Sequence, residues 1–155
     1  MTVGGIPLIY LGDEVGTLND YTYRDDPARA LDSRWVHRPK TDWDVYAKRS
    51  KTKTVAGRVY QNIQSLIALR KQKPVFSAGE LEIILTGNAH VLAYTRQSGQ
   101  QRAVIFANFS ESQQSIPGRV LEQYHCRAKT RLYGLSEWPP GRDLILAPMD
   151  FLVLA

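Results

Sequence analysis

The chain opens with an apolar run, Ile6–Leu11, in which polar and hydrophobic residues do not alternate. A strand with this pattern is typically covered on both faces, as in a parallel sheet. Gly12 ends the run, and the acids Asp13 and Glu14 follow at its carboxyl end. We expect a buried parallel strand here, although almost nothing later in the chain supplies a parallel neighbour. The run therefore resembles the last strand of a larger sheet.

One helix is predicted from about Thr54 to Lys71, where hydrophobic residues recur at spacings of three and four. Thr54 suits the N-cap position, and Pro74 stops the helix. A glycine inside a helix weakens it by about 1 kcal/mol, and Gly57 lies inside the predicted helix. Our hypothesis is that a glycine is needed there because another part of the backbone approaches closely. The irregular stretch before the helix is long for a compact domain, and its aromatic residues argue against plain disorder.

Short β-type runs alternate with turn residues in the remainder of the chain. Six or seven strands at this spacing predict an antiparallel sandwich or barrel. The runs span residues 80–85, 91–96, 102–108, 115–117, 127–133, 143–146 and 151–154. The one domain boundary that the pattern suggests lies near Pro74, which divides the chain into residues 1–75 and 76–155. The predicted fold class is mostly β, with the sandwich at the C-terminal end.

Composition and charge narrow the class of protein. The chain has 155 residues, of which 43% are hydrophobic, and a formal net charge of +5. Its basic residues are scattered, and the densest run, Lys48 to Lys53, is better explained as a solvated loop than as a nucleic-acid patch. No apolar stretch approaches the roughly 20 residues that cross a bilayer. We therefore expect neither a nucleic-acid partner nor a membrane.

Cysteine and histidine limit the chemistry further. Cys126 is the single cysteine, so an internal disulfide is excluded and a buried, inert thiol is expected. We expect a bacterial cytoplasmic location, with secretion as the alternative, because many secreted bacterial proteins also lack disulfides. His37, His90 and His125 lie far apart and lack metal-ligand spacing. We expect no metal and no cofactor.

Asp13 and Glu14 are the most obvious carboxylates. Glycoside hydrolysis uses two carboxyl groups roughly 5 to 9.5 Å apart across a sugar. Adjacent residues of an extended chain point to opposite sides, so one catalytic pair made from both acids is not expected. We expect one of the two to face a site and the other to make an ion pair or cap a loop.

Two further groups of residues suit sugar binding, each with a simpler alternative. Arg34 follows Asp32 by two residues, and a guanidinium fork beside Trp35 would suit a hydroxyl-rich ligand. On spacing alone, a loop held by an Asp32–Arg34 salt bridge is favoured. Trp138 begins a Trp-Pro-Pro-Gly turn and is a candidate sugar-stacking residue, but a hydrophobic lid on the sandwich is favoured.

Several segments resemble the α-amylase family. Residues 5–16, Gly-Ile-Pro-Leu-Ile-Tyr-Leu-Gly-Asp-Glu-Val-Gly, resemble the eighth-strand segment of its barrels. Residues 18–21 and 32–39 are similar to the amylosucrase branch, which polymerises glucose from sucrose. The helix and the closing strands, including Ala107–Ser110, match as well. The resemblance implies a (β/α)₈ barrel followed by a sandwich domain, with residues 1–75 as the end of the barrel (eighth strand, long loop and eighth helix).

The resemblance also implies a retaining mechanism with an Asp nucleophile, a Glu acid/base and a second, stabilising Asp. In the family these lie on the fourth, fifth and seventh strands. This sequence contains neither the Gly-x-Arg-x-Asp segment of the nucleophile nor the His-Asp pair of the stabiliser. A complete barrel takes about 250 residues, far more than precede the sandwich here. We therefore expect no catalytic residue in this chain and no activity from it alone.

The resemblance assigns supporting roles to three residues. Arg34 matches the arginine that closes the floor of the glucose pocket by pairing with an aspartate early in the barrel. That aspartate is absent from this sequence, so Arg34 is expected to be unpaired. Asp13 and Glu14 match supporting acids at the end of the strand. The implied partners are sucrose, an α-glucan and the missing part of the barrel.

Two further expectations concern the chain as a whole. Surfaces that would face the barrel are expected to be exposed and to cause self-association. The alternative function is a non-catalytic sandwich module that packs or binds glucan, with Trp138, Tyr124 and Tyr133 as its candidate platform.

Overall fold

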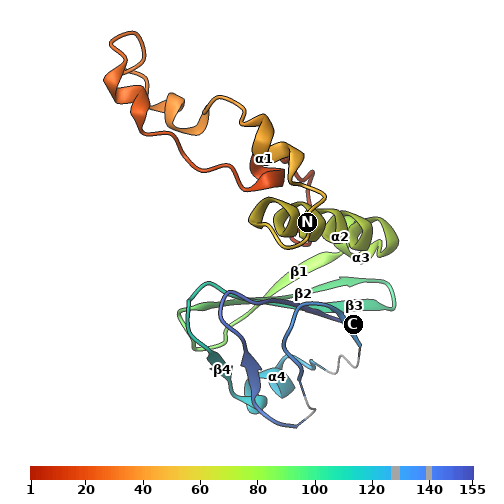
Figure 1. Cartoon of the computed structure of the whole chain (residues 1–155). Coiled ribbons are helices and arrows are strands. Elements are labelled where there is room, and N and C mark those ends of the chain that lie inside the picture. The colour runs from red at the N-terminus through yellow and green to blue at the C-terminus, as the bar shows by residue number, and fades with distance from the viewer. Residues whose placement is uncertain (127–129, 139–140) are drawn as a thin grey trace. The chain divides into compact units, whose positions relative to one another are not determined.

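The computed structural model describes residues 1–126, 130–138 and 141–155 (Figure 1). The chain forms two compact units. The first, here called the sandwich unit, combines Met1–Ile6 with Leu69–Ala155, and the second, the loop–helix unit, is Pro7–Ala68. The division lies inside helix α2 (Val55–Gln72), which contributes its last residues to the sandwich unit.

The sandwich unit contains a five-stranded antiparallel sheet with the strand order β1-β2-β3-β7-β5 and a two-stranded sheet of β4 and β6. The prediction of a mostly β, antiparallel fold is therefore confirmed. Of the predicted run 127–133, the structure places β5 at its end, and residues 127–129 lie outside the described residues. The strands are β1 Glu80–Ile84, β2 Val91–Ser98, β3 Gln101–Asn108, β4 Gln114–Ile116, β5 Arg131–Tyr133, β6 Leu144–Leu146 and β7 Phe151–Leu154.

Strands β2 and β3 form a hairpin that sets the register at the centre of the sheet. Ser98 pairs with Gln101, which leaves a two-residue turn. Such turns need a positive φ, and Gly99 supplies it at 56°. The turn at Gly99 and Gln100 thus aligns the two longest strands.

Side chains alternate between the two faces of the sheet, and a cluster of buried residues lies on each face. On one face, Phe106 of β3 packs in a cluster with Leu121 of α4 (Gly118–Gln123) and Leu144 of β6. On the other face, Ile105 of β3 packs with Phe76 of the short helix α3 (Val75–Ala78). Burial on both faces explains the continuous apolar run in β3.

Cys126 belongs to the first of these clusters and is buried. Burial raises the pKa of its thiol to about 11, so the side chain stays protonated near neutral pH. The expectation of a buried, inert thiol is confirmed.

In the loop–helix unit, most of α2 follows three 3₁₀ helices, η1 (Asp13–Val15), η2 (Thr22–Asp25) and η3 (Ser33–His37), and the short helix α1 (Trp43–Ala47). The predicted N-cap is confirmed, because the Thr54 hydroxyl accepts a hydrogen bond from the Gly57 amide at 3.0 Å. A Cβ on Gly57 would lie 2.0 Å from the carbonyl oxygen of Lys51. The hypothesis of a close backbone approach is therefore confirmed as well.

The predicted strand Ile6–Leu11 is wrong: these residues have no regular structure. Ile6 is 98% exposed and Leu8 is 87% exposed, so the segment is not covered on either face. A strand is stabilised by hydrogen bonds to a neighbouring strand, and no described residue pairs with this segment. Of the expected last βα unit of a barrel, the structure thus contains the helix and the loop but not the strand.

Candidate substrate-pocket support site

Two glycines shape the turn that carries the acids. Gly12 and Gly16 flank η1 and have φ values of 103° and 71°, a region that other residues rarely adopt. A Cβ on Gly12 would lie 2.7 Å from the Thr17 hydroxyl oxygen, so the turn also requires the absence of a side chain. The amide of Thr17 donates to the Gly12 carbonyl at 3.0 Å, which closes the turn. Asp13 and Glu14 therefore lie on a tight, locally fixed turn.

Glu14 is the more firmly held of the two acids. Its carboxylate accepts hydrogen bonds from the Gly12 amide at 2.8 Å and from the Tyr46 hydroxyl of α1 at 2.5 Å. Burial alone would raise the pKa of Glu14, but the hydrogen bonds from Tyr46 and from backbone amides outweigh it and lower the pKa. The same contact raises the pKa of the Tyr46 hydroxyl. Glu14 thus links the turn to α1.

Asp13 differs from Glu14 in its surroundings. Its carboxylate accepts one hydrogen bond, from the Tyr10 amide at 3.0 Å, and its side chain is exposed. It lines a half-open hollow of about 320 Å³ together with Asn19 and His37. Asn19 Oδ1 lies 3.0 Å from His37 Nδ1, so these two polar groups are already paired. Asp13 thus lines a hollow, whereas Glu14 makes the structural contacts, and a role of Asp13 at a substrate site stays a prediction.

Arg34 is paired, contrary to the expectation from the resemblance. Its Nε lies 2.8 Å from Asp32 Oδ1, and its Nη2 donates to Asp32 Oδ2 at 2.9 Å. Hydrogen bonds from the Arg34 side chain, and then from its backbone amide, hold the pKa of Asp32 at about 2. Asp32 also caps η3 through that amide. The simpler alternative, a loop held by a salt bridge, is the one the structure contains, because the acid two residues away supplies both oxygens of the fork.

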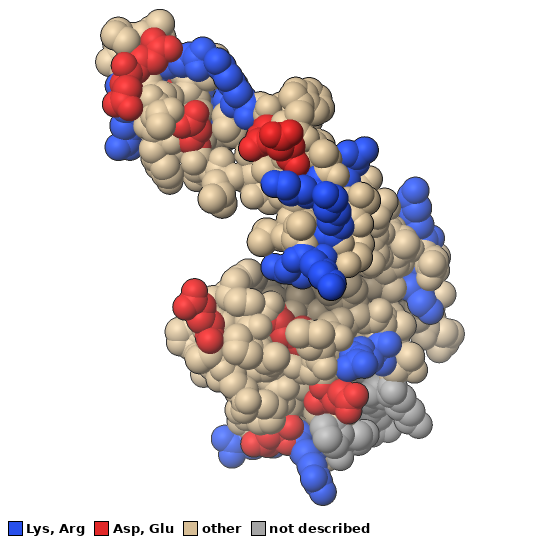
Figure 2. Space-filling view, in the orientation of Figure 1, with Lys and Arg blue, Asp and Glu red and all other residues tan. Residues whose placement is uncertain are grey.

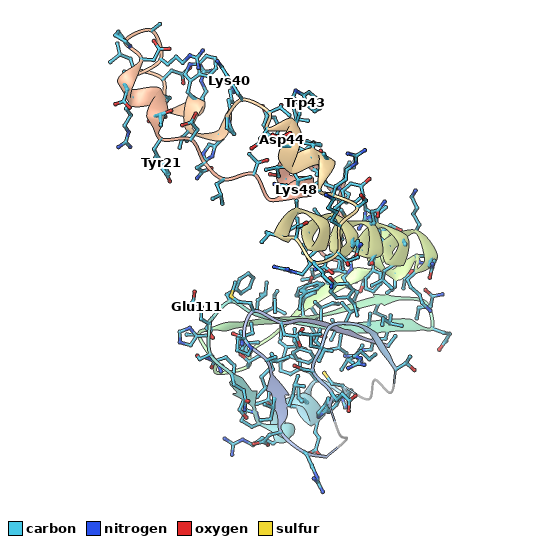
Figure 3. The ribbon with its side chains drawn as sticks, viewed as in Figure 1. Tyr21, Lys40, Trp43, Asp44, Lys48 and Glu111 are labelled. Atoms are coloured by element: carbon cyan, nitrogen blue, oxygen red, sulfur yellow. The ribbon has the colours of Figure 1, made fainter. Side chains whose placement is uncertain are left out.

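Trp35 is covered by arginines. The guanidinium carbon of Arg29 lies 4.5 Å from the centre of its ring, and that of Arg38 lies 5.9 Å away. Other rings of this unit are more open: Tyr10 is 53% exposed, Tyr21 is 59% exposed, and Trp43, which projects from α1 in Figure 3, is 74% exposed. A sugar-stacking role for Trp35 stays a prediction, and it would require an arginine to move.

The three candidate aromatics of the sandwich unit do not form one platform. Trp138 and Tyr124 pack against the cluster around Phe106, whereas Tyr133 packs against the cluster on the opposite face of the sheet. The indole of Trp138 donates to the Arg142 carbonyl at 3.0 Å, which supports the interpretation as a lid on the sandwich. Pro139 and Pro140, which follow Trp138 in the predicted turn, lie outside the described residues.

Sequence reasoning missed Tyr46, the residue that holds Glu14. The two are 32 positions apart, and nothing in the local pattern links them. It also missed the Asn19–His37 pair, since neither residue lies in a periodic segment.

Two further features, a metal centre and a membrane span, are absent from the part of the chain that the structure describes. Among the residues that the structure describes, there is no group of three or more His, Cys, Asp or Glu side chains placed to hold a metal ion. Within the same residues, no helix has the length and apolar character of a membrane span. Figure 2 shows Lys and Arg side chains in several separate places on the face drawn, with acidic side chains between them.

Comparison with known proteins identifies the class of fold. Residues 81–153 match the family described as the maltogenic amylase C-terminal domain. A trehalulose synthase from Pseudomonas mesoacidophila has the same fold over 71% of this chain, with a TM-score of 0.55 and 21% identity. A debranching enzyme of Nostoc punctiforme matches 64% of the chain, with a TM-score of 0.53 and 17% identity.

Two curated relatives are similar in sequence. A trehalose synthase of Thermus thermophilus is 25% identical over an alignment that covers 100% of this chain and 18% of the relative. An oligo-1,6-glucosidase of Heyndrickxia coagulans is 33% identical over 35% of this chain and 10% of the relative. The chain thus spans less than a fifth of the length of these relatives. Together the matches support an α-amylase family C-terminal region.

Proposed function

We propose that the chain is the C-terminal part of an amylosucrase-like enzyme of the α-amylase family and that it supports catalysis without performing it. The parent reaction would be retaining transfer of glucose from sucrose to an α-glucan, with release of fructose. The observation that carries this proposal is the order of parts: an acid-bearing turn, the Arg34 loop, α2, and a sandwich of which residues 81–153 match an amylase C-terminal domain.

The choice of sucrose rests on the resemblance of residues 18–21 and 32–39 to amylosucrases. A solved trehalulose synthase with the substrate sucrose shares the fold at 21% identity, which supports the fold and leaves the substrate as a proposal. In the parent enzyme, Arg34 would exchange Asp32 for the barrel aspartate. Both partners are carboxylates, so the bidentate geometry of the fork would be kept. Asp13 would face the pocket, and Glu14 would hold the turn to α1.

Assays of the purified chain test the non-catalytic part of the proposal. With sucrose and a maltooligosaccharide as substrates, we expect neither fructose release nor glucan growth, because the nucleophile, acid/base and stabiliser are absent from the sequence. Fructose release above a heat-denatured sample would overturn this part.

The DNA upstream of the Met1 codon tests the parent reaction. If this DNA encodes the remaining barrel strands, the joined protein, meaning the upstream part and this chain expressed as one polypeptide, should release fructose from sucrose and lengthen glucan. Arg34→Ala should then lower its kcat/KM about 10- to 100-fold, as expected for a lost charge-assisted hydrogen bond, whereas Arg49→Ala should not. A joined protein that interconverts other disaccharides and leaves sucrose untouched would contradict the choice of substrate.

A non-catalytic module is the second candidate function, and the packing of Trp138 on the sandwich favours a packing role over glucan binding. Retardation of the chain in a glucan affinity gel, lost in Trp138→Ala and kept in Trp43→Ala, would favour glucan binding instead. Equal mobility with and without glucan would leave the packing role.

We also propose that the exposed residues of the segment Ile6–Leu11 bind other barrel strands in the parent enzyme and a second copy in the isolated chain. Sedimentation velocity over a range of concentrations tests this. Association that weakens in Leu8→Ser supports the proposal, and a monomer at all concentrations contradicts it.

A further inference from the structure

The N-terminal residues Met1–Ile6 belong to the sandwich unit, although the residues that follow them along the chain belong to the loop–helix unit. Thr2 is 2% exposed, and its hydroxyl oxygen lies 2.6 Å from the hydroxyl oxygen of Tyr94, which is also buried, in the middle of β2. A polar side chain buried this deeply is held by its hydrogen bond. Nothing in the sequence pattern of Met1–Gly5 predicts the contact between Thr2 and Tyr94, which are 92 positions apart in the sequence.

Arg96 of β2 contacts the segment Met1–Gly5 and is 3% exposed. Its Nε donates to the Val75 carbonyl at 3.2 Å, and its Nη1 donates to the Val3 carbonyl at 2.9 Å. None of the salt bridges found among the described residues involves Arg96. Burying a guanidinium is costly unless its donors are satisfied, so these carbonyls hold the charge in place.

Arg70, near the end of α2, binds the same segment at both ends. Its Nη1 donates to the Met1 carbonyl and to the Phe76 carbonyl, each at 2.6 Å. Its Nη2 donates to the Gly5 carbonyl at 2.6 Å. One planar group therefore joins the N-terminal segment, α2 and α3.

Gly4 allows the backbone to approach this closely. Its φ is 108°, and a Cβ at this position would lie 3.1 Å from Arg96 Nη1. Gly5 also has a positive φ, at 63°, but a Cβ there would meet no atom within 4 Å. An alanine at either position would strain the backbone, but only an alanine at Gly4 would also crowd Arg96. Comparing the two substitutions therefore separates the two effects.

We propose that Arg70 and Arg96 form an arginine clamp that binds the backbone carbonyls of Met1–Gly5 and fixes the point at which the chain leaves the sandwich unit. The fork of a guanidinium reaches two carbonyls in fixed directions, which a lysine ammonium does not reproduce. In the parent enzyme that we propose, this point lies directly before the last barrel strand. Only this last statement rests on the proposed function, whereas the clamp itself does not.

Backbone ¹⁵N relaxation of the whole chain tests the clamp. We expect order parameters of about 0.85 for Val3, Gly4 and Gly5 in the wild type and values below 0.6 in Arg96→Lys and Arg70→Lys. Arg119→Lys, an exposed arginine of α4, should leave them unchanged. The amides of β3 report whether each variant is folded, since they should keep their order parameters in every variant.

The glycine pair provides a test that does not alter either arginine. Gly4→Ala should lower the order parameters of the segment to the same values, whereas Gly5→Ala should lower them little. The clamp is overturned if Gly4 is already mobile in the wild type, or if Arg96→Lys and Gly4→Ala both leave the segment ordered. None of these measurements uses a sugar, so the clamp and the proposed function can fail separately.

Discussion

Arg34 and Glu14 each find their partners within the loop–helix unit. Arg34 uses both oxygens of Asp32, and Glu14 uses the Tyr46 hydroxyl and the Gly12 amide. Exposed ion pairs contribute little to stability, so the main effect of the Asp32–Arg34 pair is to orient the guanidinium. In the parent enzyme that we propose, this orientation would have to change when Arg34 exchanges Asp32 for the barrel aspartate.

The pKa of Asp32 reports on that pair. Arg34→Ala should raise it from about 2 toward its ordinary value of 3.8, because the side-chain hydrogen bonds that favour the charged form are lost. Because the pKa is lowered, the contribution of the pair to stability is complete above pH 3.8 and is lost as the pH falls through about 2. Carboxyl ¹³C shifts measured against pH check this, with Arg38→Ala as a control that should cause a smaller change. An unchanged Asp32 titration would contradict the observed geometry.

Gly57 provides a test in which the usual sign is reversed. In an exposed helix, replacing Gly by Ala stabilises by about 1 kcal/mol. Here the new methyl group would meet the Lys51 carbonyl, so Gly57→Ala should lower the free energy of unfolding of the helix. Thermal unfolding followed by circular dichroism measures the effect, and Ser65→Ala on the exposed side of α2 should instead be neutral or stabilising. Stabilisation by Gly57→Ala would contradict the close approach.

At the scale of elements, the strands of the sandwich unit were predictable because each run is bounded by turn residues whose backbone requirement is specific, such as Gly99. Helices α3 and α4 were missed, since 4 and 6 residues are too few for a helical period to be visible. The run Ile6–Leu11 was predicted as a strand from its unbroken apolar pattern and from the resemblance to a barrel strand. A strand depends on partners, which a local pattern does not contain.

The same distinction applies to the site. The acid-bearing turn and the Asp32–Arg34 pair were visible because their residues are close in sequence. Tyr46, the Asn19–His37 pair and the arginines over Trp35 were not, because their contacts depend on how an irregular loop folds back on itself.

Two phenylalanines near the end of β3 separate core packing from surface exposure. Phe106 is fully buried, whereas Phe109 is 67% exposed. Phe106→Ala should lower the free energy of unfolding of the sandwich unit by about 3 to 5 kcal/mol, because it leaves a cavity between β3, α4 and β6. Phe109→Ala should change it by less than about 0.5 kcal/mol. Urea unfolding curves measure both, and similar losses in the two variants would contradict the assignment of Phe106 to the core.

At the scale of the whole molecule, the two units differ in how completely they are covered. The sandwich unit buries both faces of its sheet, and its residues 81–153 match an amylase C-terminal domain. The segment Ile6–Leu11 instead exposes most of its hydrophobic side chains. This contrast fits a covered sheet joined to a segment whose sheet partners, in the parent enzyme that we propose, belong to a barrel.

Amide hydrogen exchange on a sample shown to be monomeric tests this account most directly. We predict strong protection of Ile105 and Val153, in the centre of the five-stranded sheet, and exchange of the Leu8 and Ile9 amides close to the rates of an unstructured chain. Protection of Leu8 and Ile9 equal to that of Ile105 in the monomer would contradict the account, because the segment would then have found its partners within this chain.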